Sequence, residues 1–120
     1  MTVRRLKSYT GAEGRVYRYY FVGTRIAAAN APAHPATEYV FEISTDGTKF
    51  SPVSVFLPIT APVAWSAAHG RDLSDAEKYA GAKMRLLRAL DASADLVREH
   101  PHFVLDADML EELLAQLDLD

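Results

Sequence analysis

The sequence predicts one α+β domain spanning residues 1–120, in which an antiparallel meander sheet of four or five strands, built by residues 3–57, is packed on one face by C-terminal helices. Three observations support this fold class. β-Branched and aromatic residues concentrate in the first half. Capping signals and helical periodicity concentrate in the second half. The 120 residues can bury one hydrophobic core but leave no room for a second domain.

The first predicted element is a hairpin of strands over residues 3–10 and 15–26. The turn between them, Thr10–Gly14, contains two glycines that can adopt turn conformations. The second strand carries apolar residues on both of its faces, which predicts a central position in the sheet. Gly23 marks a bulge in this strand or its end.

Residues 27–36 predict a surface loop, because they hold two prolines and show no periodicity. The loop is either a plain connector or a binding loop. A second hairpin follows, with strands over residues 37–44 and 49–57. A three-residue loop, Thr45–Gly47, would place Tyr39 opposite Val53 and the apolar sets of both strands on one face.

The chain then becomes helical. Thr60 predicts the cap of a short helix over residues 61–69, and Gly70 its stop. A capping box of Ser74 and Glu77 begins the longest helix, because each can bond the backbone amide of the other. One stripe of this helix is expected to be apolar and to consist of Ala76, Tyr79, Ala80, Met84, Leu87 and Leu90, with Lys78, Arg85 and Arg88 toward solvent.

The C-terminal part leaves one boundary open, since the long helix runs to about residue 99 or breaks near Ser93. A short fifth strand is predicted over residues 102–105. Asp106 should cap a final helix, with Leu105 and Leu110 at staple positions. Its apolar face, which could instead dock on a partner, comprises Met109, Leu110, Leu113, Leu114 and Leu117.

Charge is distributed unevenly. Residues 1–25 hold six basic residues and one acidic residue, whereas residues 91–120 hold nine acidic residues and one basic residue. The two ends either attract each other within the fold or serve partners. Without cysteine or a long apolar segment, the chain is expected to be cytoplasmic, with no membrane contact.

The sequence contains no nucleophile, nucleotide-binding or metalloprotease motif, which favours a non-catalytic protein, leaves a small enzyme as an alternative, and predicts no cofactor. His100 and His102, beside Glu99, have metal-ligand spacing, but a third ligand is not evident, so no metal site is predicted. Paired carboxylates such as Glu38 and Glu42 are read as solvated charge at a sheet edge.

Three binding functions remain. The leading prediction is a non-catalytic protein that acts through protein contacts, with a homodimer as one form. The first alternative is a small-molecule site or small enzyme with a pocket between sheet and helices, whose candidate residues are Tyr17, Tyr19, Glu38 and His102. The second alternative is single-stranded nucleic acid bound by the basic aromatic hairpin, through Arg5, Lys7, Arg15, Arg18 and Tyr20.

Overall fold

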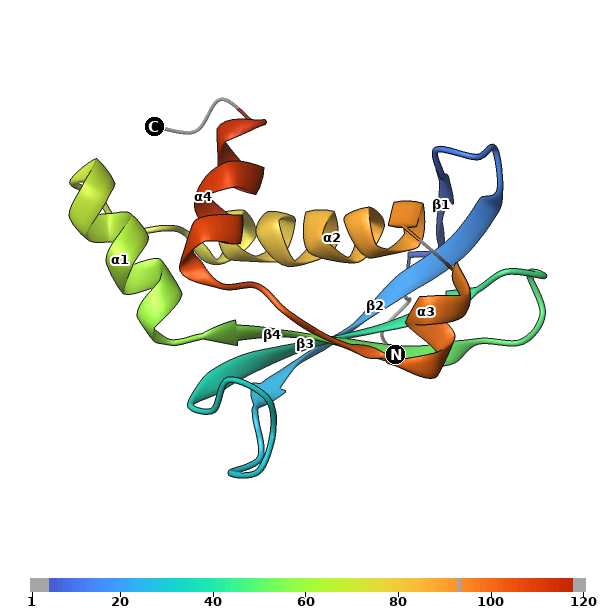
Figure 1. Cartoon of the computed structure of the whole chain (residues 1–120), viewed down its shortest axis with the longest axis horizontal. Coiled ribbons are helices and arrows are strands. Elements are labelled where there is room, and N and C mark those ends of the chain that lie inside the picture. The colour runs from blue at the N-terminus through green and yellow to red at the C-terminus, as the bar shows by residue number, and fades with distance from the viewer. Residues whose placement is uncertain (1–4, 93, 118–120) are drawn as a thin grey trace.

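In the computed structural model, a five-stranded sheet is covered on one face by helices (Figure 1). The structure describes residues 5–92 and 94–117. The strands and helices are, in chain order, β1 (Lys7–Thr10), β2 (Val16–Ile26), β3 (Ala36–Ser44), β4 (Ser51–Pro58), α1 (Thr60–His69), α2 (Asp75–Ala92), α3 (Ala94–Glu99), β5 (His102–Val104) and α4 (Ala107–Ala115).

The sheet confirms the predicted meander and extends it. Strands β1 to β4 pair antiparallel with their neighbours in sequence, and β5 pairs with β4 in parallel, so the fifth strand departs from the antiparallel prediction. The parallel direction follows from the helical crossover between β4 and β5. Strand β1 begins at Lys7, four residues later than predicted, and residues 3 and 4 lie outside the described residues.

The predicted three-residue loop is wrong. Tyr39 pairs with Val55, and Ile43 with Ser51, so the loop is longer and the register is shifted by two residues. An even shift keeps the apolar sets of both strands on one face, as predicted. The Asp46 carboxylate explains the longer loop, because it accepts hydrogen bonds from the amides of Thr48 and Lys49. These bonds hold the pKa of Asp46 well below its usual value.

The helix boundaries follow their capping signals with one exception. The Ser74 hydroxyl accepts from the Glu77 amide at 3.1 Å, and the Glu77 carboxylate accepts from the Ser74 amide at 2.8 Å, as the capping box requires. The cap of α1 was predicted wrongly: Ile59 occupies the position without a side-chain bond, and Thr60 is already helical. Gly70 ends α1 in the left-handed conformation, with φ of 73°.

Helix α2 lies between the sheet and α4, which changes its predicted apolar stripe (Figure 1). Gly81, Ala82 and Leu86 are buried although the stripe omitted them, and Ala76 is exposed. A Cβ on Gly81 would stand 3.1 Å from the Leu110 side chain, so the missing side chain lets α4 approach closely. A helix buried on two sides does not show a single stripe.

Arg85 and Arg88 of α2 were expected to face solvent but reach the C-terminal segment instead. The Arg85 guanidinium donates to the Val104 carbonyl, and Arg88 pairs with Glu112 of α4 at 3.1 Å. Helix α2 ends at Ala92 and α3 begins at Ala94, so the chain forms two helices there; Ser93 lies outside the described residues. The predicted alternative of a break near Ser93 thus falls on a residue outside the described part of the chain.

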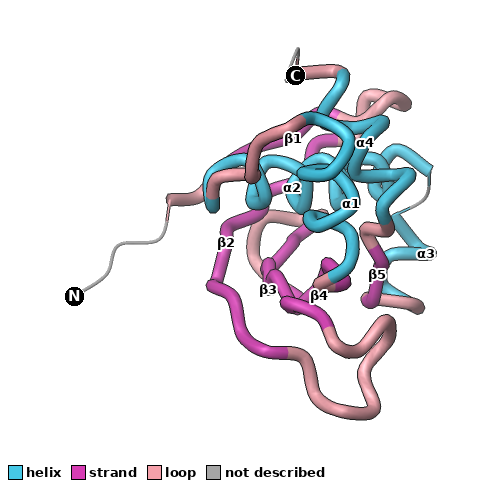
Figure 2. The backbone as a smooth tube through the Cα atoms, turned by 90° about the vertical axis from the view of Figure 1, so that its left-hand side faces the viewer, coloured by secondary structure: helices cyan, strands magenta, loops and turns pink. Residues whose placement is uncertain are grey.

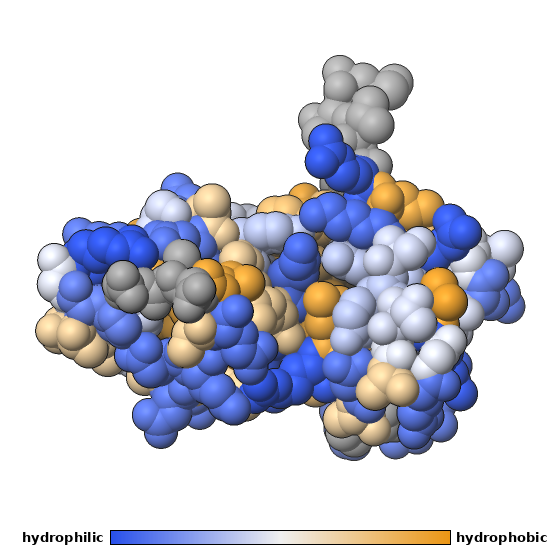
Figure 3. Space-filling view, turned by 90° about the horizontal axis from the view of Figure 1, so that it is seen from above, coloured by the Kyte–Doolittle hydropathy of each residue, from blue (hydrophilic) through white to orange (hydrophobic). Residues whose placement is uncertain are grey.

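Helix α4 uses its apolar face within the molecule. Asp106 caps it, accepting a hydrogen bond from the Met109 amide at 2.8 Å, as predicted. Leu110, Leu113 and Leu114 are fully buried where α4 packs on α1 and α2. Viewed from above, the surface is mainly hydrophilic, with separate hydrophobic patches, in keeping with this burial (Figure 3).

The opposite face of the sheet is covered by no described helix. The loop after β2 folds back onto it, and Ala27, Ala31 and Ala36 pack against Phe56 in a small second core. Figures 1 and 2 show this loop projecting from the end of the sheet remote from the β1–β2 turn. Residues 27–35 thus form the predicted surface loop.

Candidate functional site

Strand β2 extends well beyond β1, leaving part of its edge open (Figures 1 and 2). Strand β1 pairs with β2 only from Val16 to Tyr19, whereas β3 continues to pair with β2 as far as Ile26. Within the described ranges, no strand pairs with Phe21–Ile26 on the β1 side. Such an edge offers backbone donors and acceptors to another extended chain.

The direction of the backbone groups on this edge follows from one hydrogen bond. The Ala27 amide donates to the Ala36 carbonyl of β3 at 3.0 Å. Because hydrogen-bonded and non-hydrogen-bonded pairs alternate along an antiparallel ladder, Arg25 also directs its backbone toward β3. Thr24 and Ile26 therefore direct their amide and carbonyl groups toward the open edge.

A hollow of about 520 Å³ lies beside this edge, between the sheet and the first turns of α2. Phe21 and Tyr39 contribute aromatic rings from the sheet, and Tyr79 contributes one from α2. The Phe21 and Tyr79 rings meet edge to face, with centroids 4.8 Å apart. The complete lining is Phe21, Thr24, Thr37, Tyr39, Asp75, Ala76, Lys78 and Tyr79.

A second hollow of about 510 Å³ continues the first along α1, since Thr37 and Lys78 line both. Ile59 and Val63 line the second hollow and are 55% and 64% exposed. Ile26, at the end of the open edge, is 88% exposed. Apolar side chains at this level of exposure, gathered around a hollow, are typical of a surface that another molecule covers.

Three lysines lie near the aromatic hollow, one in its lining and two beside Tyr79. The Lys7 ammonium lies 6.0 Å from the centroid of the Tyr79 ring, and Lys78 lines the hollow. Lys83 follows Tyr79 by one helical turn, and burial together with the nearby charge of Lys7 lowers its pKa. None of the three forms an ion pair with a described residue. Asp75 is the carboxylate in the described lining, and its charge adds to burial in raising the pKa of Tyr39.

The four residues predicted to line a ligand pocket lie on two faces of the sheet. Tyr17 and Tyr19 belong to the core beneath the helices, whereas Glu38 and His102 lie on the opposite face. The structure does form a hollow between sheet and helices with tyrosines in it, but those tyrosines are Tyr39 and Tyr79.

Glu38 is a buried carboxylate held by a hydrogen-bonded ion pair. The Arg25 guanidinium donates to both its carboxylate oxygens, at 2.8 and 3.0 Å, and the Ser54 hydroxyl donates to one of them. The Arg25 bonds lower the pKa of Glu38, against the raising effect of burial, and Ser54 and the nearby charge of His102 lower it further. Glu38 is 6% exposed, whereas the side chain of Arg25 is 68% exposed.

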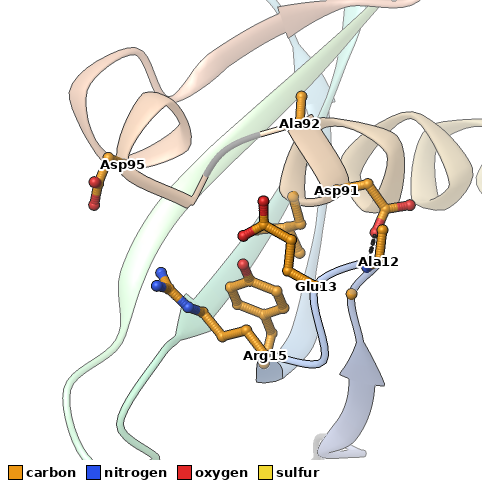
Figure 4. A pocket seen from close by; sticks show the side chains of 9 residues that line it. Ala12, Glu13, Arg15, Asp91, Ala92 and Asp95 are labelled. Carbon is orange, nitrogen blue, oxygen red and sulfur yellow. Dashed lines mark hydrogen bonds between the residues drawn. The ribbon is translucent and has the colours of Figure 1, made fainter.

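Tyr17 borders a smaller pocket of about 150 Å³ where the β1–β2 turn meets the end of α2 (Figure 4). Glu13, Arg15 and Asp95 reach toward it. Asp91 fixes this contact, because its carboxylate accepts from the Ala12 amide at 3.0 Å and from the Tyr9 hydroxyl. We interpret the pocket as the seam where the hairpin docks on α2.

The nucleic-acid candidates do not share a face. Lys7 lies over Tyr79 on the helix side, whereas the Arg18 side chain approaches Gly47 and Tyr20 packs on Phe50 on the other side. Arg5 and Arg15 are exposed outside the strands. This arrangement provides no single basic aromatic surface, and nucleic-acid binding stays a prediction.

The partner-helix candidates and the acidic end are largely engaged internally. Met109 is half-buried, and Leu117 is 43% exposed. Among described residues the acidic end meets the basic hairpin through Asp91. Its ion pairs there are formed with His69, Arg88 and Arg98, none of which belongs to the hairpin. In the described part of the chain, no three His, Asp or Glu side chains gather as metal ligands.

Comparison with family models, curated proteins and solved structures finds no significant match to this chain. None of the helices in the described ranges combines the length and apolarity that a membrane span needs. The functional assignment therefore depends on the geometry of the open β2 edge and the hollow beside it.

Sequence reasoning missed the site residues because their exposure depends on tertiary structure. Phe21, Thr24 and Ile26 belong to the predicted second strand, but β1 begins only at Lys7, opposite Tyr19, so no described strand pairs with them on that side. The bulge between Phe21 and Gly23 also shifts the alternation, so that Phe21 and Thr24 line one hollow. The signal available in the sequence was Gly23, which predicted a bulge or a strand end.

Proposed function

We propose that this protein is a non-catalytic interaction protein that binds an extended segment of another protein along the open edge of β2. The observation that supports this most strongly is the open stretch of β2 beside an aromatic hollow. In this mode of recognition, backbone hydrogen bonds supply affinity and a side-chain pocket supplies specificity.

The segment would add a strand to the sheet next to β2. The outward backbone groups of Thr24 and Ile26 can bond a chain of any sequence, since they recognise only peptide groups. Thr24 lies opposite Tyr39, on the helix side of the sheet. A side chain of the added strand on that side would enter the hollow that Phe21, Tyr39 and Tyr79 line.

A small-molecule ligand is the second candidate, favoured by the hollow volume of about 520 Å³, which is in the range of small-molecule pockets. The two functions differ in their dependence on the β2 backbone. A small ligand in the hollow would need the aromatic rings of Phe21 and Tyr79 but not the outward amide of Ile26.

Two substitutions at Ile26 separate these cases. Ile26→Pro removes the outward amide donor but leaves the bonds between β2 and β3, because proline is tolerated on the open side of an edge strand. Ile26→Thr removes the exposed apolar side chain and keeps the amide. The probe is a capped seven-residue peptide with a central phenylalanine and threonine or valine elsewhere.

We expect amide chemical shifts of β2 and α2 to change on titration with this peptide, for the wild type and for Ile26→Thr. Ile26→Pro should lose binding while its thermal unfolding stays close to that of the Thr variant. Equal binding by the two variants, or no binding by the wild type, would contradict strand addition.

A homodimer through the same edge is tested on the protein alone. Light scattering at high concentration should report a monomer if the edge serves another protein. A dimer that Ile26→Pro dissociates would instead assign the edge to a second copy.

A further inference from the structure

We infer that the bound segment carries an apolar side chain for the aromatic hollow and a carboxylate two residues away, on the side that meets Lys7 and Lys83. This inference rests on the proposed function and adds the chemistry of the partner. The charges around the hollow support it.

The spacing of two residues follows from strand geometry. In an extended chain, side chains two positions apart point to the same face, about 6 to 7 Å apart. A residue opposite Thr24 faces the helices, so its neighbours two positions away do so as well. On the β1 side that neighbour approaches Lys7, which pairs with Tyr19 at the end of β1.

Lys7 and Lys83 make this end of the hollow positive. Lys7 lies over Tyr79, and Lys83 follows that tyrosine by one helical turn, so both lysines flank the same residue. Burial and the charge of Lys7 lower the pKa of Lys83. Neither has an ion-pair partner among residues 5–92 and 94–117. A partner carboxylate would relieve their repulsion as well as attract each of them.

The other end of the hollow does not favour a carboxylate of the partner. Lys78 and Asp75 both line it there, and their opposite charges offset each other. The adjoining hollow likewise contains Asp72 beside Lys78. The structure therefore favours one acidic position, not an acidic residue on each side of the anchor.

Three capped seven-residue peptides test this inference on the full-length chain. All have a central phenylalanine; one is neutral, one has an aspartate two residues before the phenylalanine, and one has an aspartate two residues after it. At low salt we expect one aspartate peptide to bind about 3- to 10-fold more tightly than the neutral peptide, the range for one or two exposed ion pairs. Added salt should reduce this gain.

The double variant Lys7→Gln/Lys83→Gln should lose the gain, so that it binds the aspartate peptides and the neutral peptide with equal affinity. Lys49→Gln is the matched control, because Lys49 is exposed in the β3–β4 loop. The inference is overturned if both aspartate peptides bind like the neutral one, or if the double variant keeps the gain. Absence of binding by all three peptides would instead overturn the proposed function.

Discussion

Phe21 of β2 and Tyr79 of α2 meet edge to face, with ring centroids 4.8 Å apart, and join the open strand to the helix above it. Lys7 lies over the same tyrosine ring, at 6.0 Å from its centroid. This aromatic contact therefore forms part of the wall of the hollow and joins α2 to β2. It also lies next to the positive charge of Lys7.

Tyr79→Ala should destabilise the fold by about 1 to 3 kcal/mol, less than a fully buried aromatic residue because Tyr79 is half-buried. Tyr79→Phe keeps the ring and should change the free energy of unfolding by less than about 0.5 kcal/mol. Denaturant unfolding measures both. Tyr79→Phe should keep peptide binding because it keeps the aromatic ring, whereas Tyr79→Ala should weaken it. A Tyr79→Phe variant that fails to bind would contradict an aromatic hollow.

Glu38 should make stability depend on pH in the acid range. Its pKa is lowered in the folded protein and lies at about 4.5 in a model peptide, so the unfolded state binds more protons as pH falls. Its contribution is complete above pH 4.5 and is lost as pH falls through the folded pKa. Glu38→Gln should lower stability at pH 7 by about 1 to 3 kcal/mol.

The difference in unfolding free energy between wild type and Glu38→Gln, measured from pH 7 to pH 2, should shrink toward low pH. Asp46 and Glu77 also have lowered pKa values, and the pKa of Glu77 is lowered to about 2, chiefly by Arg71. Because both proteins contain these residues, their contributions cancel in the difference. A difference that stays constant with pH would show that the Glu38 charge does not act through its ion pair.

The capping box at Ser74 should also be measurable. Ser74→Ala removes the hydroxyl that accepts from the Glu77 amide and should cost about 1 kcal/mol of stability. Ser74→Thr keeps a hydroxyl and serves as the control. Equal thermal midpoints for the Ala and Thr variants would contradict a stabilising cap.

Tyr9 and Asp91 should be energetically coupled. The Tyr9 hydroxyl donates to the Asp91 carboxylate at 2.8 Å, and this hydrogen bond is the main cause that raises the pKa of Tyr9. A double-mutant cycle with Tyr9→Phe and Asp91→Asn should give a coupling of about 0.5 to 1.5 kcal/mol. Additive effects of the two changes would mean that the bond does not hold the hairpin on α2.

Most helix ends with local capping signals were predicted correctly from the sequence, with Thr60 as the exception. Ser74, Asp106 and Gly70 mark helix ends through bonds within a few residues, so their role needs no tertiary information. The predicted register of β3 and β4 was wrong by two residues. The reason is that the Asp46 side chain organises a longer loop through three local hydrogen bonds. The alternation of apolar residues correctly placed the apolar sets of both strands on one face, but it did not predict this loop.

The site was harder to predict, because it depends on where strands stop and on which helix covers which face. The sequence indicated a hollow between sheet and helices and tyrosines within it, but it could not show that Tyr39 and Tyr79, rather than Tyr17, would line it. It also could not show that β1 pairs with β2 only up to Tyr19. Those facts follow from the packing of distant segments.

Amide hydrogen exchange in the free protein tests the open edge of β2 most directly. The amides of Thr24 and Ile26 should exchange fast, while those of Arg25 and Ala27, which face β3, should exchange slowly. Bound peptide should then slow the exchange of Thr24 and Ile26. If both are already as slow as Arg25 and Ala27 in the free protein, the edge is covered and the proposed binding mode is wrong.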